Sequence, residues 1–144
     1  MRGYAEKTAL PAREQELFRR ATALVESIPD IEGVRCHELA RAVGRLLDLS
    51  WQDGYYGFVQ HTWLWTRELR QDHIVARTGF PNILDVYSVG SLPMVRLVDA
   101  DCVSLPHIGW SYRPGPDRTD IREAMVETLV GHMTSGASAK YADI

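Results

Sequence analysis

The chain has 144 residues, 45% of them hydrophobic, and a formal net charge of −3 from 16 basic and 19 acidic residues. This length supports one sizeable core and predicts a single domain over residues 1–144. The slight negative charge gives no general attraction to phosphate backbones, so we expect no nucleic-acid partner.

Neither a leader nor a membrane segment is predicted. Residues 1–7 carry charge where a signal peptide needs an apolar run, and no stretch approaches the roughly 18 apolar residues of a membrane span. The two cysteines, Cys36 and Cys102, do not indicate a disulfide framework, and we expect both to be free thiols, with a single bridge as the open alternative. We therefore expect a cytoplasmic protein with no membrane partner.

Three helices are predicted from the spacing of apolar residues. Residues 10–28, with Pro11 at the start, form an amphipathic N-terminal helix. Residues 36–47 form a second helix, in which Gly44 costs about 1 kcal/mol relative to Ala; a close contact between helix and sheet would explain that glycine. Residues 120–134 form a C-terminal helix with Asp120 and Glu123 as a capping box, and residues 135–144 are expected to be a frayed tail.

The predicted strands lie between the second and third helices. Residues 55–65 are rich in aromatic and β-branched side chains and predict one long strand after a turn at residues 52–54. Residues 83–87 and 94–98 predict two more strands. Residues 66–82 are expected to be a loop, with a short strand at residues 73–75 left open. Residues 99–116 are expected to be an irregular connection.

An ordered trio of side chains suits thiol chemistry. Cys36 opens a helix, His61 lies in a strand and Asp85 lies in another. A helix N-terminus and a nearby imidazolium both lower a cysteine pKa and so favour the nucleophilic thiolate. If the helix packs across the two strands, the thiol meets one imidazole nitrogen while the carboxylate takes the proton of the other. The aromatic side chains proposed for the cleft wall, where substrate would bind, are Tyr55, Tyr56 and Trp63.

Each member of the trio also has a structural interpretation. A buried cysteine on an apolar helix face is ordinarily a small hydrophobe, and a strand histidine among aromatics is often part of a core. Asp85 fits this interpretation least, because a buried carboxylate without a partner costs several kcal/mol.

The remaining candidates have weaker support. Cys102 lies beside carboxylates that would raise its pKa and is expected to be structural, while His37 is expected to face solvent or the cleft rim. No Cys-x-x-Cys or His-x-x-x-His pair supports a metal. A zinc site built from Cys36, His61 and either Asp85 or Cys102 stays an alternative, and no cofactor is expected.

Three segments resemble known enzymes. The sequence CHELARAV at residues 36–43 resembles the nucleophile helix of the transglutaminase-like, papain-like cysteine enzyme superfamily. QHTWL at residues 60–64 resembles its histidine strand, and ILDV at residues 83–86 resembles its aspartate strand. The resemblance implies an α+β fold in which the cysteine-bearing helix packs on a small antiparallel sheet, with residues 36–98 as the catalytic core and helices flanking it. It also implies Cys36 as nucleophile, His61 as base and Asp85 as the group that orients the base.

The chain departs from that superfamily in two respects. It lacks the extra β domains of large crosslinking transglutaminases, which favours a stand-alone hydrolase or modifying enzyme of bacterial or phage type. It also has no glutamine shortly before Cys36 to serve as an oxyanion donor. Gln52 or Gln60 could take that role, although strand alternation puts Gln60 on the face opposite His61.

We therefore expect a cysteine hydrolase or acyl transferase that acts on an amide or peptide bond. Its substrate would be a peptide, a protein or a small amide. Two alternatives stay open on the sequence. One is a non-catalytic binding or structural module on the same fold, within a phage particle or a larger assembly. The other is a metal-dependent hydrolase. The substrate and the oligomeric state are not determined by the sequence.

Overall fold

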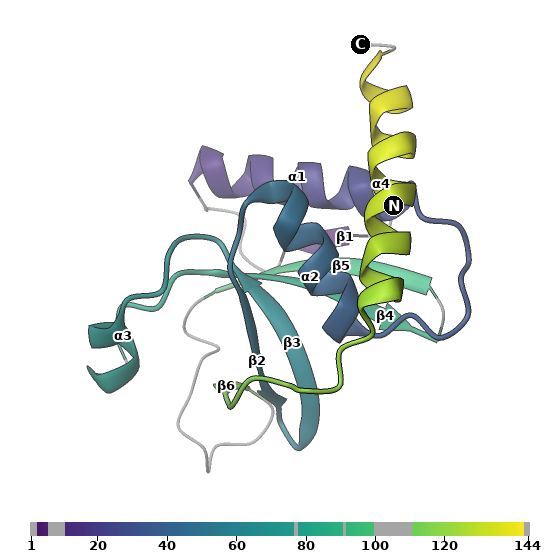
Figure 1. Cartoon of the computed structure of the whole chain (residues 1–144). Coiled ribbons are helices and arrows are strands. Elements are labelled where there is room, and N and C mark those ends of the chain that lie inside the picture. The colour runs from purple at the N-terminus through teal and green to yellow at the C-terminus, as the bar shows by residue number, and fades with distance from the viewer. Residues whose placement is uncertain (1–2, 6–10, 77, 91, 100–110, 143–144) are drawn as a thin grey trace.

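A computed structural model describes residues 3–5, 11–76, 78–90, 92–99 and 111–142 (Figure 1). Within these residues a sheet of six strands runs in the order β1-β5-β4-β3-β2-β6. The strands are β1 (Gly3–Ala5), β2 (Trp51–Tyr56), β3 (Val59–Trp65), β4 (Ile83–Val89), β5 (Leu92–Val98) and β6 (Tyr112–Pro114). The helices are α1 (Ala12–Glu26), α2 (Cys36–Leu47), α3 (Gln71–Ala76) and α4 (Glu123–Ala142).

The predicted α+β fold is confirmed. Strands β5, β4, β3, β2 and β6 are antiparallel, while β1 joins β5 in parallel. Helices α1 and α2 lie on one face of the sheet and α4 crosses them, so the cysteine-bearing helix is flanked by an N-terminal and a C-terminal helix (Figure 1). None of the described helices has the length and apolar character needed to cross a membrane.

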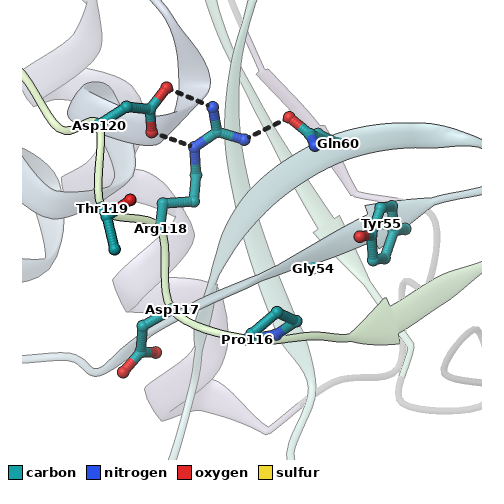
Figure 2. A pocket seen from close by; sticks show the side chains of 8 residues that line it. All are labelled: Gly54, Tyr55, Gln60, Pro116, Asp117, Arg118, Thr119 and Asp120. Carbon is teal, nitrogen blue, oxygen red and sulfur yellow. Dashed lines mark hydrogen bonds and ion pairs between the residues drawn. The ribbon is translucent and has the colours of Figure 1, made fainter.

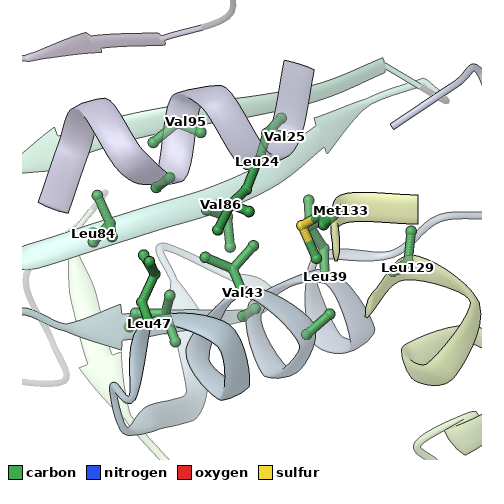
Figure 3. Close-up of a cluster of buried hydrophobic side chains, with 14 of the residues drawn as sticks. Leu24, Val25, Leu39, Val43, Leu47, Leu84, Val86, Val95, Leu129 and Met133 are labelled. Carbon is green, nitrogen blue, oxygen red and sulfur yellow. The ribbon is translucent and has the colours of Figure 1, made fainter. Parts of the chain in front are cut away.

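The main hydrophobic core lies between the helices and this face of the sheet. Figure 3 shows Leu39, Val43 and Leu47 of α2 pointing toward the strands, as their helical spacing predicts. Leu129 and Met133 of α4 close the same core. A second, aromatic cluster covers the opposite face of the sheet and consists of Trp63, Trp65, Phe80, Ile83, Val98 and Tyr112.

The predicted long strand at residues 55–65 is wrong, because it is a hairpin. β2 and β3 turn at Gly57 and Phe58, and Gly57 has a positive φ of 61°. The turn expected at residues 52–54 lies inside β2. A Cβ on Gly54 would sit 2.1 Å from the Arg113 backbone oxygen, so this glycine marks a close approach of β6 rather than a turn.

Other boundaries also differ from the prediction. Residues 73–75 belong to helix α3, and β6 lies inside the connection expected to be irregular. α4 begins at Glu123, and Asp120 binds arginines instead of capping the helix. The expected frayed tail is helical through Ala142; a Cβ on Gly136 would lie 2.5 Å from Ser27 Cβ, which shows how closely α4 packs on the end of α1.

The pairing of β3 with β4 is short, and this feature positions the functional site. These strands pair only at Leu64–Leu84 and Trp65–Ile83, whereas β2–β3 and β4–β5 pair along most of their lengths. The N-terminal half of β3 therefore diverges from the C-terminal half of β4 (Figure 1). Helix α2 packs on both strands, with its first residue near this opening.

Gly44 makes the close contact between helix and sheet that its position predicts. A Cβ there would lie 2.8 Å from both Leu64 Cδ2 and the Leu49 oxygen. We expect Gly44→Ala to lower the free energy of unfolding by about 1–3 kcal/mol, because overpacking outweighs the better helix propensity of alanine. Gly131→Ala in α4 is the matched control: no atom lies within 4 Å of its Cβ, so stability should rise by about 0.5–1 kcal/mol. Denaturant unfolding measures both, and a stabilising Gly44→Ala would contradict the packing.

Candidate active site

Cys36 is the first helical residue of α2 and is partly buried. The preceding residue, Arg35, is extended, with φ −106° and ψ 152°, and its side chain does not cap the helix. The thiol therefore lies at the positive end of the helix dipole, beside first-turn amides that no capping side chain occupies.

His61 and Asp85 are brought together as the sequence suggests. His61 Nε2 lies 2.7 Å from Asp85 Oδ1, and the two side chains are 12% and 2% exposed. The other carboxylate oxygen accepts a hydrogen bond of 2.5 Å from the Tyr112 hydroxyl and lies 3.4 Å from Arg96 Nη2. Arg96 is also the cross-strand neighbour of Asp85 in the β4–β5 ladder. The buried carboxylate thus has partners on both oxygens, and it fixes which nitrogen of His61 faces away from it.

The opening between β3 and β4 lets the histidine meet the helix. By strand alternation His61 and Asp85 point to the same face of the sheet as Trp63 and Ile83, which is the face opposite the core of α2. A continuous ladder would separate these side chains from the first turn of α2. The ladder ends at Leu64, and the interaction between the His61 ring and Cys36 contributes to the lowered pKa of the thiol and to the raised pKa of the ring.

Electrostatics favour a charged pair of thiolate and imidazolium. Burial raises the pKa of the Cys36 thiol, but hydrogen bonds from His37 and His61 and electrostatic attraction to their rings outweigh it and lower the pKa to about 6. Burial lowers the pKa of His61, but the negative charge and hydrogen bond of Asp85, with a smaller contribution from Cys36, raise it to about 10. Near neutral pH the sulfur is therefore ionised and the His61 ring is protonated.

A second histidine touches the sulfur. His37, expected to face solvent or the cleft rim, is buried with 7% exposure. Its Nδ1 lies 3.7 Å from Cys36 Sγ and 2.7 Å from Thr62 Oγ1. Helical periodicity could not reveal this, because His37 lies off the apolar face of α2 and its burial comes from polar groups on β2 and β3.

Those polar groups form one network. The Thr62 hydroxyl donates to Asp53 Oδ1 over 2.7 Å. Arg41 binds both oxygens of Asp53, at 3.0 and 2.6 Å, and the Arg118 backbone N–H adds a third donor at 2.9 Å. Burial raises the pKa of Asp53, but its bonds to Arg41, Arg118 and Thr62 outweigh burial and hold the pKa below the usual range. Asp53 is thus a buried anion that sequence reasoning placed in a turn.

The three aromatic residues expected in the cleft wall have different environments. Trp63 is fully buried and packs behind His61, with ring centroids 6.3 Å apart, so it presents no surface to a ligand. Tyr56 helps to line a cavity of about 120 Å³ beside the site. The other residues lining that cavity are His61, Asp85, Tyr87 and Arg96. Tyr55 lines a different and larger pocket.

The larger pocket has a volume of about 340 Å³ and lies where β2, β3 and the segment after β6 meet (Figure 2). It is lined by Gly54, Tyr55, Gln60, Pro116, Asp117, Arg118, Thr119 and Asp120. Arg118 binds Gln60 Oε1 at 2.7 Å and both oxygens of Asp120, at 3.0 and 2.7 Å. Gln60 directly precedes His61, and Asp120 binds Arg35, which directly precedes Cys36. The pocket wall is thus connected to the sequence neighbours of His61 and Cys36, although neither of those two residues lines the pocket.

Of the two glutamines considered as oxyanion donors, Gln52 is already engaged. Its side-chain nitrogen donates to the backbone oxygen of Asp53 over 2.7 Å, and its side-chain oxygen accepts from Trp65 Nε1 at 3.4 Å. The side chain of Gln60 lines the larger pocket, on the side of β3 away from His61. The backbone N–H groups at the start of α2 are thus the donors that lie beside the thiol.

Metal ligation was the remaining alternative for these side chains. Over the described ranges, no group of three His, Cys, Asp or Glu side chains is arranged to hold a metal ion. Cys102, the other thiol considered, lies outside the described residues, so its expected structural role stays a prediction.

Glu38 joins the first turn of α2 to the segment before α4. Its carboxylate is fully buried and binds Arg35, while Arg122 donates to it from the side chain at 2.7 Å and from the backbone at 3.2 Å. Burial raises the pKa of Glu38, but these bonds outweigh it and lower the pKa to about 2. Sequence patterns do not predict this ion cluster, because Arg122 lies 84 residues along the chain from Glu38.

We expect the thiol to react as its electrostatics predict. In a Cys102→Ser background, the rate of iodoacetamide alkylation should have its pH midpoint near 6, well below the value of about 8.5 for a free cysteine. Asp85→Asn removes the charge that supports the His61 imidazolium, so the midpoint should rise by about one pH unit. Asp48→Asn, at the exposed far end of α2, should leave it unchanged. A parent midpoint near the free-cysteine value would contradict the ion pair.

The Glu38 cluster predicts acid sensitivity. The folded pKa of about 2 lies below the unfolded value, so the stabilisation is complete above about pH 4.5 and is lost as pH falls toward the folded value. Glu38→Gln should lower the free energy of unfolding by about 2–3 kcal/mol at neutral pH, with the deficit shrinking in acid. Glu127→Gln, which removes the exposed partner of Arg45, should cost at most about 0.5 kcal/mol. A deficit that does not depend on pH would refute the assignment.

Comparisons with known proteins give no relative for this chain. No family model matches it. No curated protein and no solved structure matches it either. The functional interpretation therefore depends on the geometry and electrostatics of the described residues.

Proposed function

We propose that this chain is a cysteine hydrolase or acyl transferase acting on an amide or peptide bond. Cys36 is the nucleophile, His61 is the general acid and base, and Asp85 orients His61. The observation that carries the proposal is the arrangement of the three groups: Cys36 opens α2, and His61 of β3 binds the buried carboxylate of Asp85 at 2.7 Å. These surroundings lower the pKa of the thiol to about 6 and raise the pKa of His61 to about 10. The resemblance of the three segments to transglutaminase-like and papain-like enzymes supports the same roles.

The alternative of a non-catalytic module is less well supported by this site. A binding or structural domain has no need for a thiolate, and a cysteine used only for packing titrates near its ordinary pKa of about 8.5. Burying ionised groups also costs free energy unless each is paired. A buried pair that lowers the thiol pKa is better explained by nucleophilic chemistry.

The reaction follows from the positions of the groups. The Cys36 thiolate attacks the carbonyl carbon, a C–S bond forms, and the carbonyl electron pair moves to oxygen. Backbone amides at the start of α2 are the donors proposed for that oxygen. As the C–N bond breaks, the His61 imidazolium gives its proton to the leaving nitrogen and a thioester remains.

The second half returns the enzyme to its starting state. Water, or an acceptor amine in the case of acyl transfer, attacks the thioester while neutral His61 takes its proton. The C–S bond then breaks and its electron pair returns to sulfur as thiolate. Asp85 stays ionised throughout and stabilises the imidazolium at both steps.

The larger pocket supports a peptide, protein or small amide as substrate. Gln60 of its wall precedes His61 in β3, Asp120 binds Arg35 next to Cys36, and the wall also offers the hydroxyl of Thr119 and the ring of Tyr55. Such a mixture of hydrogen-bonding groups and one aromatic ring suits a peptide-like ligand rather than a purely apolar one.

A small acyl donor tests the proposal without knowledge of the substrate. With p-nitrophenyl acetate, the Cys102→Ser protein should release nitrophenolate and gain one acetyl group, which intact mass spectrometry detects and peptide mapping places on Cys36. Cys36→Ala should gain none there. His61→Gln keeps the thiol but loses the base, so acetylation at neutral pH should slow by about 100-fold or more.

The fate of the adduct separates the two reaction types. Decay in buffer alone indicates a hydrolase, and decay that is accelerated by an added primary amine with formation of its acetamide indicates an acyl transferase. Equal labelling of the parent and of Cys36→Ala, or an unchanged rate in His61→Gln, would overturn the proposal.

A further inference from the structure

The second histidine at the sulfur has no role in the reaction described above. His37 Nδ1 lies 3.7 Å from Cys36 Sγ, and the ring is buried next to the nucleophile in α2. His37 is held at two points: Nδ1 contacts Thr62 Oγ1 at 2.7 Å, and Arg41 Nη1 donates to the His37 backbone oxygen at 3.0 Å. The ring is therefore fixed relative to the sulfur.

The network determines where the His37 proton sits. Asp53 is ionised, because its bonds to Arg41 hold its pKa below the usual range, so its oxygens only accept hydrogen bonds. The Thr62 hydroxyl donates its single proton to Asp53 Oδ1 over 2.7 Å. Thr62 has no proton left for His37, so the 2.7 Å contact between them requires a proton on His37 Nδ1.

That proton limits what His37 can do for Cys36. The nitrogen that faces sulfur is already protonated, so it cannot take the thiol proton, and His37 is not the base. A thiolate, in contrast, accepts a hydrogen bond from the same N–H, shared with Thr62. The contact is thus stronger when sulfur carries the negative charge, because a neutral thiol sulfur is only a weak acceptor.

We propose that His37 is a further catalytic residue of this site: a fixed Nδ1–H donor, set by Thr62 and Asp53, that holds the Cys36 sulfur as thiolate while His61 carries the proton. This inference rests on the proposed role of Cys36 as nucleophile. It gives the two histidines different roles: His61 exchanges a proton with the reactants and His37 does not.

The donor matters most when sulfur is the leaving group. In the second half of the reaction the C–S bond breaks and its electron pair goes to sulfur, while His61 is taking a proton from water or amine. His37 then stabilises the departing thiolate with a hydrogen bond that is already formed, and no proton passes from His37 to sulfur. Because the ring is held by buried partners, little reorganisation is needed at that step.

The charged groups around Cys36 and His37 allow the pH dependence of alkylation to be interpreted. His61 and Asp85 face Cys36 and each other from β3 and β4, and Asp53 and Arg41 face His37 from β2 and α2. The pKa of Asp53 lies below its usual range, so this carboxylate stays ionised between about pH 5 and 9. A change in the alkylation midpoint over that range therefore reports the thiol and the two rings that touch it.

Matched variants of Thr62 test the inference, in the Cys102→Ser background with iodoacetamide. Thr62→Val removes the hydroxyl and keeps the shape, so the proton on His37 Nδ1 is no longer fixed and the midpoint should rise by about one pH unit. Thr62→Ser keeps the hydroxyl and should match the parent. His37→Leu should raise the midpoint by a similar amount, and His37→Asn, whose amide supplies an N–H near the Nδ1 position, should restore part of the shift.

The outcomes separate this inference from the proposed function. A parent midpoint near the free-cysteine value would overturn both. A low parent midpoint that stays unchanged in Thr62→Val and His37→Leu would overturn the role of His37 alone. Circular dichroism and thermal unfolding of each variant check that the fold is kept. If a variant does not fold, nitrogen-15 NMR of the parent decides: a proton on His37 Nδ1 is expected, and a ring protonated only at Nε2 would overturn the inference.

Discussion

The hydrogen bond between His61 and Asp85 spans a place where two neighbouring strands have stopped pairing, and the site depends on that interruption. Beyond Leu64 and Leu84 the β3–β4 ladder ends. A continued ladder would have kept the paired strands between the His61 ring and the helix that carries the thiol. The separation costs backbone hydrogen bonds, and buried polar side chains offset part of that cost by binding one another. Asp85 makes most of these contacts: its carboxylate binds His61, Tyr112 and Arg96.

Successive residues of β3 support the nucleophile from two sides of the sheet. His61 points to the aromatic face and is held by Asp85, whereas Thr62 points to the helix and holds His37. Each histidine is thus connected to a buried aspartate, His61 directly and His37 through the hydroxyl of Thr62. Buried ion pairs contribute little net stability, because desolvation offsets most of their attraction. The His61–Asp85 and Arg41–Asp53 pairs instead support the two rings that lower the pKa of the Cys36 thiol.

Local patterns were enough to predict the elements but not their polar contacts. The helical spacing of Leu39 and Val43 gave the bounds of α2 correctly, because an apolar stripe of period 3.6 is encoded within a single segment. The hairpin at Gly57 was missed because tyrosine and phenylalanine on both sides of the turn have the same high strand propensity as a continuous strand. His37 was misplaced for a different reason: its burial depends on Thr62 and Asp53, which lie on other elements, and helical periodicity contains no information about such partners. The same holds for Trp63, whose place behind His61 is set by β6 and the second aromatic cluster.

The segment between β6 and α4 shows how the pocket and the nucleophile are held as one unit. The Arg118 backbone N–H binds Asp53, Asp120 binds Arg35, and Arg122 binds Glu38. Each contact joins this pocket wall to α2 or to the network behind His37. A ligand that displaced the wall would have to break the ion pair between Arg122 and buried Glu38 and the hydrogen bond from Arg118 to buried Asp53, which is costly because a buried charge loses a partner. Binding in the pocket should therefore leave Cys36, His37 and His61 in place, and under the proposed function its free energy would orient the substrate rather than assemble the site.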